Sequence, residues 1–134
     1  MKKRIAIITA LVALVVVCTV VLCACAPNAD PSKAVASLEK NGYSAYKDAT
    51  IIPAAMKLFG ISGVDCVVVG VLSTNENSES IYVVYFYNSE QASDSYDSVK
   101  SYFEEKEDAE SDWELGILGK VVWYGTKAAV KASK

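Results

Sequence analysis

Apolar residues are distributed in two different ways along the chain. From Ile5 to Leu22 nearly every residue is Ile, Val, Leu or Ala, and the run carries no charge. After Pro27 the apolar residues are instead mixed with polar ones, as in a domain that has a core and a solvated surface. The pattern therefore predicts an apolar leader followed by a globular part.

The clearest elements of the globular part are two strands. Val64–Ser73 and Ile81–Tyr87 are rich in β-branched and aromatic residues, which favours strands. The polar segment 74–80 between them predicts a loop, so we expect the two strands to pair as an antiparallel hairpin. Neither strand alternates strictly between apolar and polar residues, which indicates that both of its faces are at least partly covered.

A long helix is predicted from Ser89 to Lys106. One apolar stripe recurs at helical spacing along it: Ala92, Tyr96, Val99 and Phe103. Asn88 is a capping residue at its start, and Gln91 stands where a capping box requires it. We expect the stripe to pack on the hairpin, against residues among Val67, Val69, Val83 and Tyr85.

Shorter elements complete the prediction. They are a helix between Asp30-Pro31 and Asn41-Gly42, an extended segment 43–52, a helix from Pro53 to Phe59, strands at 113–117 and 120–124 with a turn at Leu118-Gly119, and a terminal helix capped by Thr126. From residue 43 the order resembles that of a ferredoxin-like sandwich. The alternative is a curved antiparallel sheet around the single long helix. We expect an α+β fold, a two-layer antiparallel sheet packed on one long helix and loosely ferredoxin-like.

The leader has the features of an export signal. Lys2, Lys3 and Arg4 precede the apolar run, and small residues follow it. Because the run is long enough to span a bilayer, an uncleaved single-pass signal anchor is the alternative. Both interpretations place the basic residues in the cytoplasm and the rest of the chain outside.

The end of the leader, Leu22-Cys23-Ala24-Cys25, resembles the lipobox of bacterial lipoprotein precursors. That motif has four positions: first an aliphatic residue, second a variable small residue, third one of Gly, Ala and Ser, and fourth the Cys. The resemblance implies that Cys25 receives a diacylglyceryl thioether and that signal peptidase II cuts after Ala24. Two acyl chains give stable attachment. We therefore expect a signal peptide over 1–24, lipidated Cys25 and a short tether over 25–32, and a single domain over 33–134. The location expected is the extracytoplasmic face of the cell membrane, with membrane lipid as the partner of acylated Cys25. A cut after Ala26, as in ordinary secretion, is a further alternative.

Composition limits the chemistry. Histidine is absent, which excludes Ser-His and Cys-His nucleophiles and His-ligated metals. The net charge is −3, and it becomes −6, from ten basic and sixteen acidic side chains, once the three leader charges are removed. This charge argues against a nucleic-acid partner.

Cys66 is expected to be a small buried hydrophobe. We expect no cofactor and a non-catalytic binding module; a small envelope enzyme using carboxylates is the alternative.

Two clusters are candidate sites. Seven of the eleven residues from Glu104 to Glu114 are acids, and the candidate metal ligands among them are Asp108, Glu110 and Asp112. The segment lacks the Gly and Glu spacing of a calcium loop, so a solvated helix end is the simpler interpretation. Aromatic side chains with a polar tip are common at interfaces. The candidate binding surface, for an envelope protein or peptide, consists of Tyr82, Tyr85, Tyr87, Trp123 and Tyr124; the alternative is that they form core and rim.

Overall fold

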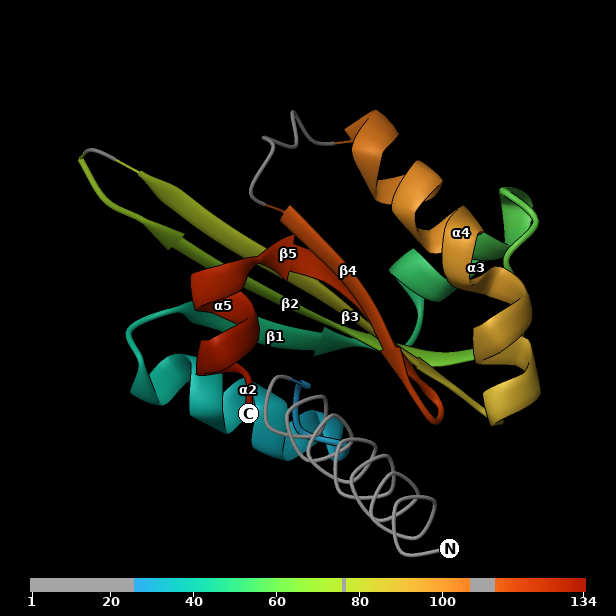
Figure 1. Cartoon of the computed structure of the whole chain (residues 1–134), viewed down its shortest axis with the longest axis horizontal. Coiled ribbons are helices and arrows are strands. Elements are labelled where there is room, and N and C mark those ends of the chain that lie inside the picture. The colour runs from blue at the N-terminus through green and yellow to red at the C-terminus, as the bar shows by residue number, and fades with distance from the viewer. Residues whose placement is uncertain (1–25, 76, 107–112) are drawn as a thin grey trace, which may run out of the picture.

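A five-stranded antiparallel sheet forms the centre of the domain in the computed structural model, which describes residues 26–75, 77–106 and 113–134 (Figure 1). The strands are β1 (Ser44–Asp48), β2 (Val64–Ser73), β3 (Ser78–Phe86), β4 (Trp113–Leu118) and β5 (Val121–Thr126). Their order across the sheet is β1-β2-β3-β5-β4, and every neighbouring pair is antiparallel. The predicted antiparallel pairing of β2 with β3 is confirmed, but β3 begins at Ser78, inside the loop predicted over 74–80.

Helices cover both faces of this sheet within the described residues. On one face lie α2 (Pro31–Lys40) and α5 (Lys127–Ala132), and on the other lie α3 (Ile51–Leu58) and α4 (Ser89–Lys106) (Figure 1). Alternate residues of a strand point to opposite faces, so β3 contributes to two cores. Val83 and Tyr85 pack with α2 and α5, whereas Val84 and Phe86 pack with α3 and α4. This explains why neither hairpin strand alternates between apolar and polar residues.

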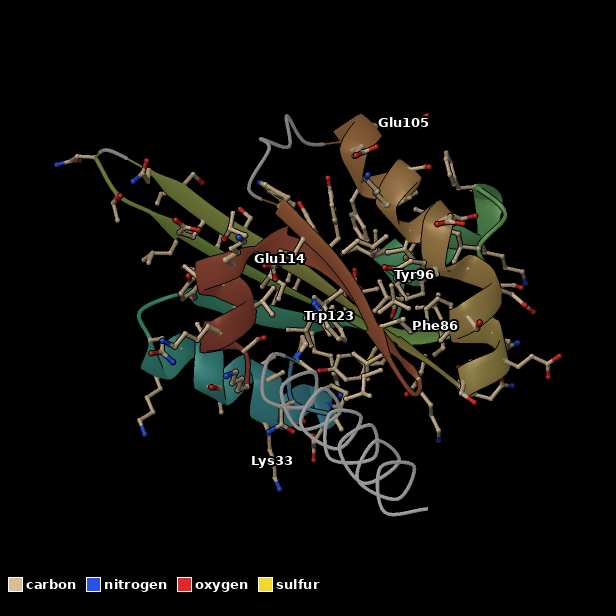
Figure 2. The ribbon with its side chains drawn as sticks, viewed as in Figure 1. Lys33, Phe86, Tyr96, Glu105, Glu114 and Trp123 are labelled. Carbon is tan, nitrogen blue, oxygen red and sulfur yellow. The ribbon has the colours of Figure 1, made fainter. Side chains whose placement is uncertain are left out.

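The α+β fold and the packing of an antiparallel sheet on the long helix are confirmed. The apolar stripe of α4 shares a core with Val67 and Val69, as expected. Val83 and Tyr85, the other expected contacts, lie instead in the core on the opposite face. Figure 2 shows Phe86 and Tyr96 on the α4 side of the sheet.

The strand order departs from the ferredoxin-like pattern. That pattern is a split β-α-β unit, in which two parallel strands joined by a helix are separated by a third strand. Here β1 and β2, which flank α3, pair directly and antiparallel, from Ser44 opposite Val71 to Asp48 opposite Val67. An antiparallel partner requires no crossover, and α3 has only eight residues. The described sheet keeps the predicted antiparallel pairing and the packing on the long helix, with a strand order of its own.

Polar caps fix the helix starts at three of the predicted positions. The side chain of Asp30 accepts hydrogen bonds from the Ser32 and Lys33 amides, at 2.9 and 3.4 Å. The Asn88 side chain accepts one from the Gln91 amide at 2.8 Å, and Thr126 accepts one from Ala129 at the start of α5. A capping box has a second hydrogen bond, in which the Gln91 side chain would accept from the backbone amide of Asn88. This bond is absent at the start of α4, where Gln91 Oε1 is buried and has no hydrogen-bond partner.

The start of α3 differs from the sequence prediction. The extended segment ends at Asp48 rather than at residue 52, and the helix begins at Ile51 rather than at Pro53. The cause is the Asp48 carboxylate, which accepts hydrogen bonds from the amides of Thr50, Ile51 and Ile52 at 2.8, 2.9 and 3.0 Å. These are amides that the first turn of a helix leaves without intrahelical partners.

Replacing Asp48 is expected to destabilise the fold in a pH-dependent way. The bond from Thr50, with those from Ile52 and Ile51, holds the pKa of Asp48 below its usual value against the opposing effect of burial. A carboxylate whose pKa is lower in the folded than in the unfolded state stabilises the fold at pH values above its unfolded pKa, which is about 3.9. This stabilisation is lost as the pH falls through the folded-state pKa. Asp48→Ala should therefore lower the free energy of unfolding at neutral pH by about 1 kcal/mol. Urea denaturation at neutral and acidic pH measures this.

The matched control is Asp97→Ala, which removes an exposed carboxylate from the middle of α4. Its effect at neutral pH should stay within about 0.5 kcal/mol. An equal loss of stability in the two variants, or an Asp48→Ala variant as acid-sensitive as the unaltered protein, would contradict the capping role.

Candidate functional site

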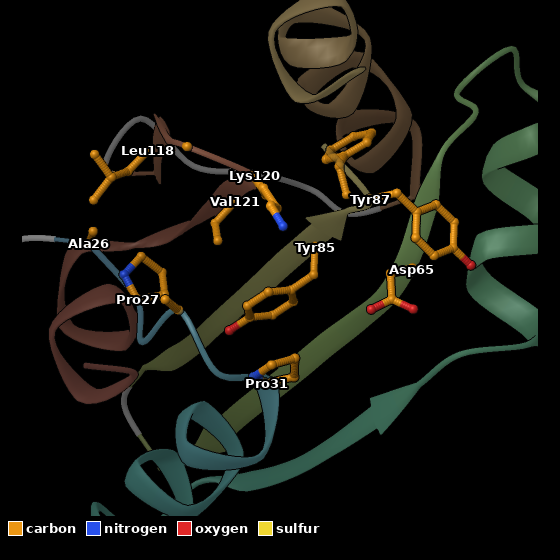
Figure 3. A pocket seen from close by; sticks show the side chains of 12 residues that line it. Ala26, Pro27, Pro31, Asp65, Tyr85, Tyr87, Leu118, Lys120 and Val121 are labelled. Atoms are coloured by element: carbon orange, nitrogen blue, oxygen red, sulfur yellow. The ribbon is translucent and has the colours of Figure 1, made fainter. Parts of the chain in front are cut away.

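A groove of about 620 Å³ lies at one end of the sheet, with Tyr85 at its centre (Figure 3). It is lined by the segment that starts at Ala26, by the ends of β2 and β3, and by the turn between β4 and β5. Pockets that hold small ligands typically measure about 300–1,000 Å³. The groove is therefore large enough to receive a ligand, and we take it as the candidate site.

The β4–β5 hairpin builds one rim of the groove. Leu118 pairs with Val121 across a two-residue turn, Gly119-Lys120. Gly119 has φ +59°, and Lys120 does not have a positive φ, as in the type II′ turns that close tight hairpins. Paired residues lie on the same face of a sheet, and Val121 belongs to the core under α2 and α5. Leu118 therefore points to that face, at the tip of the hairpin.

The other rim is the segment from Ala26 to Pro31, which is fastened to the domain. Ala26 and Pro27 are buried. The Asn28 amide donates to the Ser133 carbonyl at 2.8 Å, and the Tyr85 hydroxyl donates to the Asn28 carbonyl at 2.7 Å. The sequence predicted a tether over 25–32 and a domain starting at residue 33. The described part of that tether is instead packed against the sheet, so the folded domain includes residues from Ala26 onward.

The groove is apolar, with few ionisable groups. Asp65 and Lys120 line it and are exposed, and Tyr87 is the second tyrosine. Burial, with smaller effects of Cys66 and Asp30, raises the pKa of Tyr85. The Tyr85 phenol therefore stays protonated, and it already donates its proton to the Asn28 carbonyl. This arrangement can bind an apolar group of a ligand. Lys120 and Asp65 are available to interact with polar atoms of that ligand at the edge of the groove.

Tyr85→Phe is expected to loosen the segment that starts at Ala26. The substitution removes the bond to the Asn28 carbonyl while preserving the ring, and the unfolding free energy should fall by about 1 kcal/mol. The Asn28 amide should exchange its hydrogen faster, since its bond to Ser133 depends on the same segment. Urea denaturation and hydrogen exchange measure the two effects. Tyr46→Phe, at an exposed position on edge strand β1, should leave both unchanged; similar behaviour of the two variants would contradict the fastening role.

The five aromatic candidates do not form one surface. Tyr85 and Trp123 belong to the core under α2 and α5, and Tyr124 belongs to the core on the opposite face. Tyr82 stacks on Phe103 of α4 with ring centroids 4.1 Å apart. Tyr87 is 64% exposed. Only Tyr85 and Tyr87 among the five line the groove. The five residues are therefore parts of the core and its rim rather than one binding face.

Cys66 is buried, as predicted, and its side chain lies in the core under α2 and α5. Burial, reinforced by Asp65 and opposed by Lys47, raises the pKa of its thiol to about 11. A nucleophilic cysteine needs the thiolate. Cys66 therefore stays protonated near neutral pH and serves as a packing residue.

The remaining sequence candidates lie outside the described residues. Asp108, Glu110 and Asp112 belong to the segment 107–112, and the lipobox residues Leu22, Cys23, Ala24 and Cys25 belong to 1–25. Within the described ranges, no group of three or more acidic or cysteine side chains is arranged to hold a metal ion. No helix in those same ranges has the length and apolarity to cross a bilayer.

Comparisons with protein-family models, with curated proteins and with solved structures found no match. The sequence did not predict the groove, and the turn predicted at Leu118-Gly119 lies one residue before the observed turn, Gly119-Lys120. The two rims of the groove come from segments that are far apart in the sequence, near residues 26 and 118. Local patterns do not report contacts over that separation.

Proposed function

We propose that this chain is the precursor of a lipoprotein held on the extracytoplasmic face of the cell membrane by acylated Cys25. The observation that carries the proposal is the sequence Leu22-Cys23-Ala24-Cys25 at the end of a charge-free apolar run that follows three basic residues. A diacylglyceryl group on Cys25 supplies the two acyl chains that stable attachment requires.

The proposed mature chain, from Cys25 onward, keeps every strand and helix that the structure describes, from α2 to α5.

We further propose that the domain is a non-catalytic binding module. The groove offers apolar walls, and the phenol at its centre is already engaged by the Asn28 carbonyl. Its remaining charged groups are one carboxylate, Asp65, and one ammonium, Lys120. The apolar walls and the engaged phenol support binding of an apolar group.

Metabolic labelling with an alkyne fatty acid, combined with protease treatment, tests the proposal. The protease is added to cells whose outer layers are opened while the cytoplasmic membrane stays sealed. We expect the protein to carry the label and to be digested. A signal anchor that keeps its leader would be digested but unlabelled. Absence of label, or protection until the cytoplasmic membrane is lysed, would contradict the proposal.

A further inference from the structure

Large apolar side chains are exposed at the end of the domain where the described chain begins. Leu118 at the hairpin tip is 44% exposed and Tyr87 after β3 is 64% exposed. Both line the same groove as Ala26. Figure 3 shows Leu118 and Ala26 on one side of this groove and Tyr87 on the other. Apolar side chains gathered around a concave site mark an interaction surface.

The first described residues are held closely against this surface. Ala26 is buried, and Asn28 is held by hydrogen bonds to Ser133 and Tyr85 of 2.8 and 2.7 Å. Any residue joined to Ala26 has its Cα about 3.8 Å away. If Cys25 carries the lipid as proposed above, the attachment point is one residue away from Ala26, which lines the groove. With so short a connection, a bilayer that holds the lipid must come close to the groove and its rims.

The charge of the mature chain indicates what kind of contact this is. With ten basic and sixteen acidic side chains, the net charge is −6. Anionic headgroups repel such a body, so electrostatic attraction does not hold it against the membrane. Contact with the bilayer must come from apolar and interfacial side chains. Leucine and tyrosine provide these, because tyrosine favours the membrane–water interface.

We propose that the groove end of the domain rests on the bilayer that holds its anchor. This proposal rests on the lipid attachment proposed above. Leu118 enters the interfacial layer, Tyr87 lies at the headgroup level, and Lys120 extends its ammonium toward the headgroup phosphates, as amphipathic side chains do at interfaces. Lipid covers the groove. The anchor and this surface together fix the orientation of the domain, with the β2–β3 loop at the opposite end of the sheet pointing away.

Spin labels on the lipid-bearing protein test the orientation. A nitroxide is attached at Leu118→Cys, and in a separate variant at Leu58→Cys. Leu58 is the matched control, since it is a leucine on α3, 92% exposed and outside the groove. Buried Cys66 does not compete for the label. Each protein is placed in vesicles of phosphatidylethanolamine and phosphatidylglycerol in equal amounts. Collision rates with oxygen, which concentrates in the bilayer, and with a water-soluble nickel complex are then measured.

We expect the label at position 118 to collide several-fold less with the nickel complex and more with oxygen than the label at 58. Equal collision rates at the two positions would overturn the inference. Low rates with both reagents at position 118 would indicate a protein partner or a second copy on this surface, and would also overturn it. The intact mass of the same samples separates the two proposals. If the lipid is present and the orientation is absent, only this inference fails; if the lipid is absent, both fail.

Discussion

The Cys25→Ser variant is expected to carry no fatty acyl label and to yield no mature form that begins at residue 25. A serine hydroxyl cannot form the thioether that the resemblance to lipoprotein precursors implies, and the cut that depends on it should not occur. The precursor should therefore accumulate with its leader, residues 1–24, still attached. Gel mobility and alkyne fatty acid labelling measure the two effects.

Cys23→Ser is the matched control for that experiment. Serine is a common residue at this position of the motif that Leu22-Cys23-Ala24-Cys25 resembles, so labelling and cleavage should continue. Loss of label in both variants would show that the motif does not act as proposed. Unchanged labelling and cleavage in Cys25→Ser would remove the basis for the anchor.

The second large effect is expected from Gly125→Ala in the middle of the sheet. Gly125 lies in β5 opposite Ile81 of β3. A Cβ at this position would lie 2.5 Å from the Ser80 carbonyl oxygen and 2.7 Å from the Ile81 Cα. Because both are backbone atoms, no side-chain rotation relieves the contact, and β3 and β5 must separate. We expect the free energy of unfolding to fall by about 3 kcal/mol.

Gly60→Ala is the comparison for this substitution. Gly60 has φ +99° after the end of α3, and a Cβ there meets nothing within 4 Å. Only backbone strain opposes the change, at about 1–2 kcal/mol. Urea denaturation, monitored by tryptophan fluorescence, measures both variants. If Gly125→Ala costs no more than Gly60→Ala, the close approach of β3 and β5 is contradicted.

Local signals in the sequence predicted the elements that depend on them. The strand Val64–Ser73 and the helix Ser89–Lys106 have the predicted bounds, because β-branched runs, a helical apolar stripe and an Asn cap act over a few residues. The predicted start of α3 at Pro53 was wrong, because Ile51-Ile52 continues an extended pattern in the sequence. The side chain of Asp48 instead binds three following amides and turns the chain.

Features that depend on distant contacts were not predicted. The lack of alternation in β3 left open which residues face α4, so Tyr82 and Tyr85 were grouped although they lie on opposite faces. The pairing of β3 with β5 places the last strand inside the sheet, which no local pattern indicates. The packing of Ala26 and Asn28 beside Tyr85 and Ser133 was likewise invisible in a segment rich in proline and small residues.

Attachment of lipid at Cys25 is the central claim, and the intact mass of the protein extracted from membranes tests it most directly. The account predicts a chain from Cys25 to Lys134 whose mass exceeds that of the polypeptide by a diacylglyceryl group, with or without a further acyl chain on the amino terminus. A chain that still begins at Met1, or an unmodified cysteine at position 25, would contradict it.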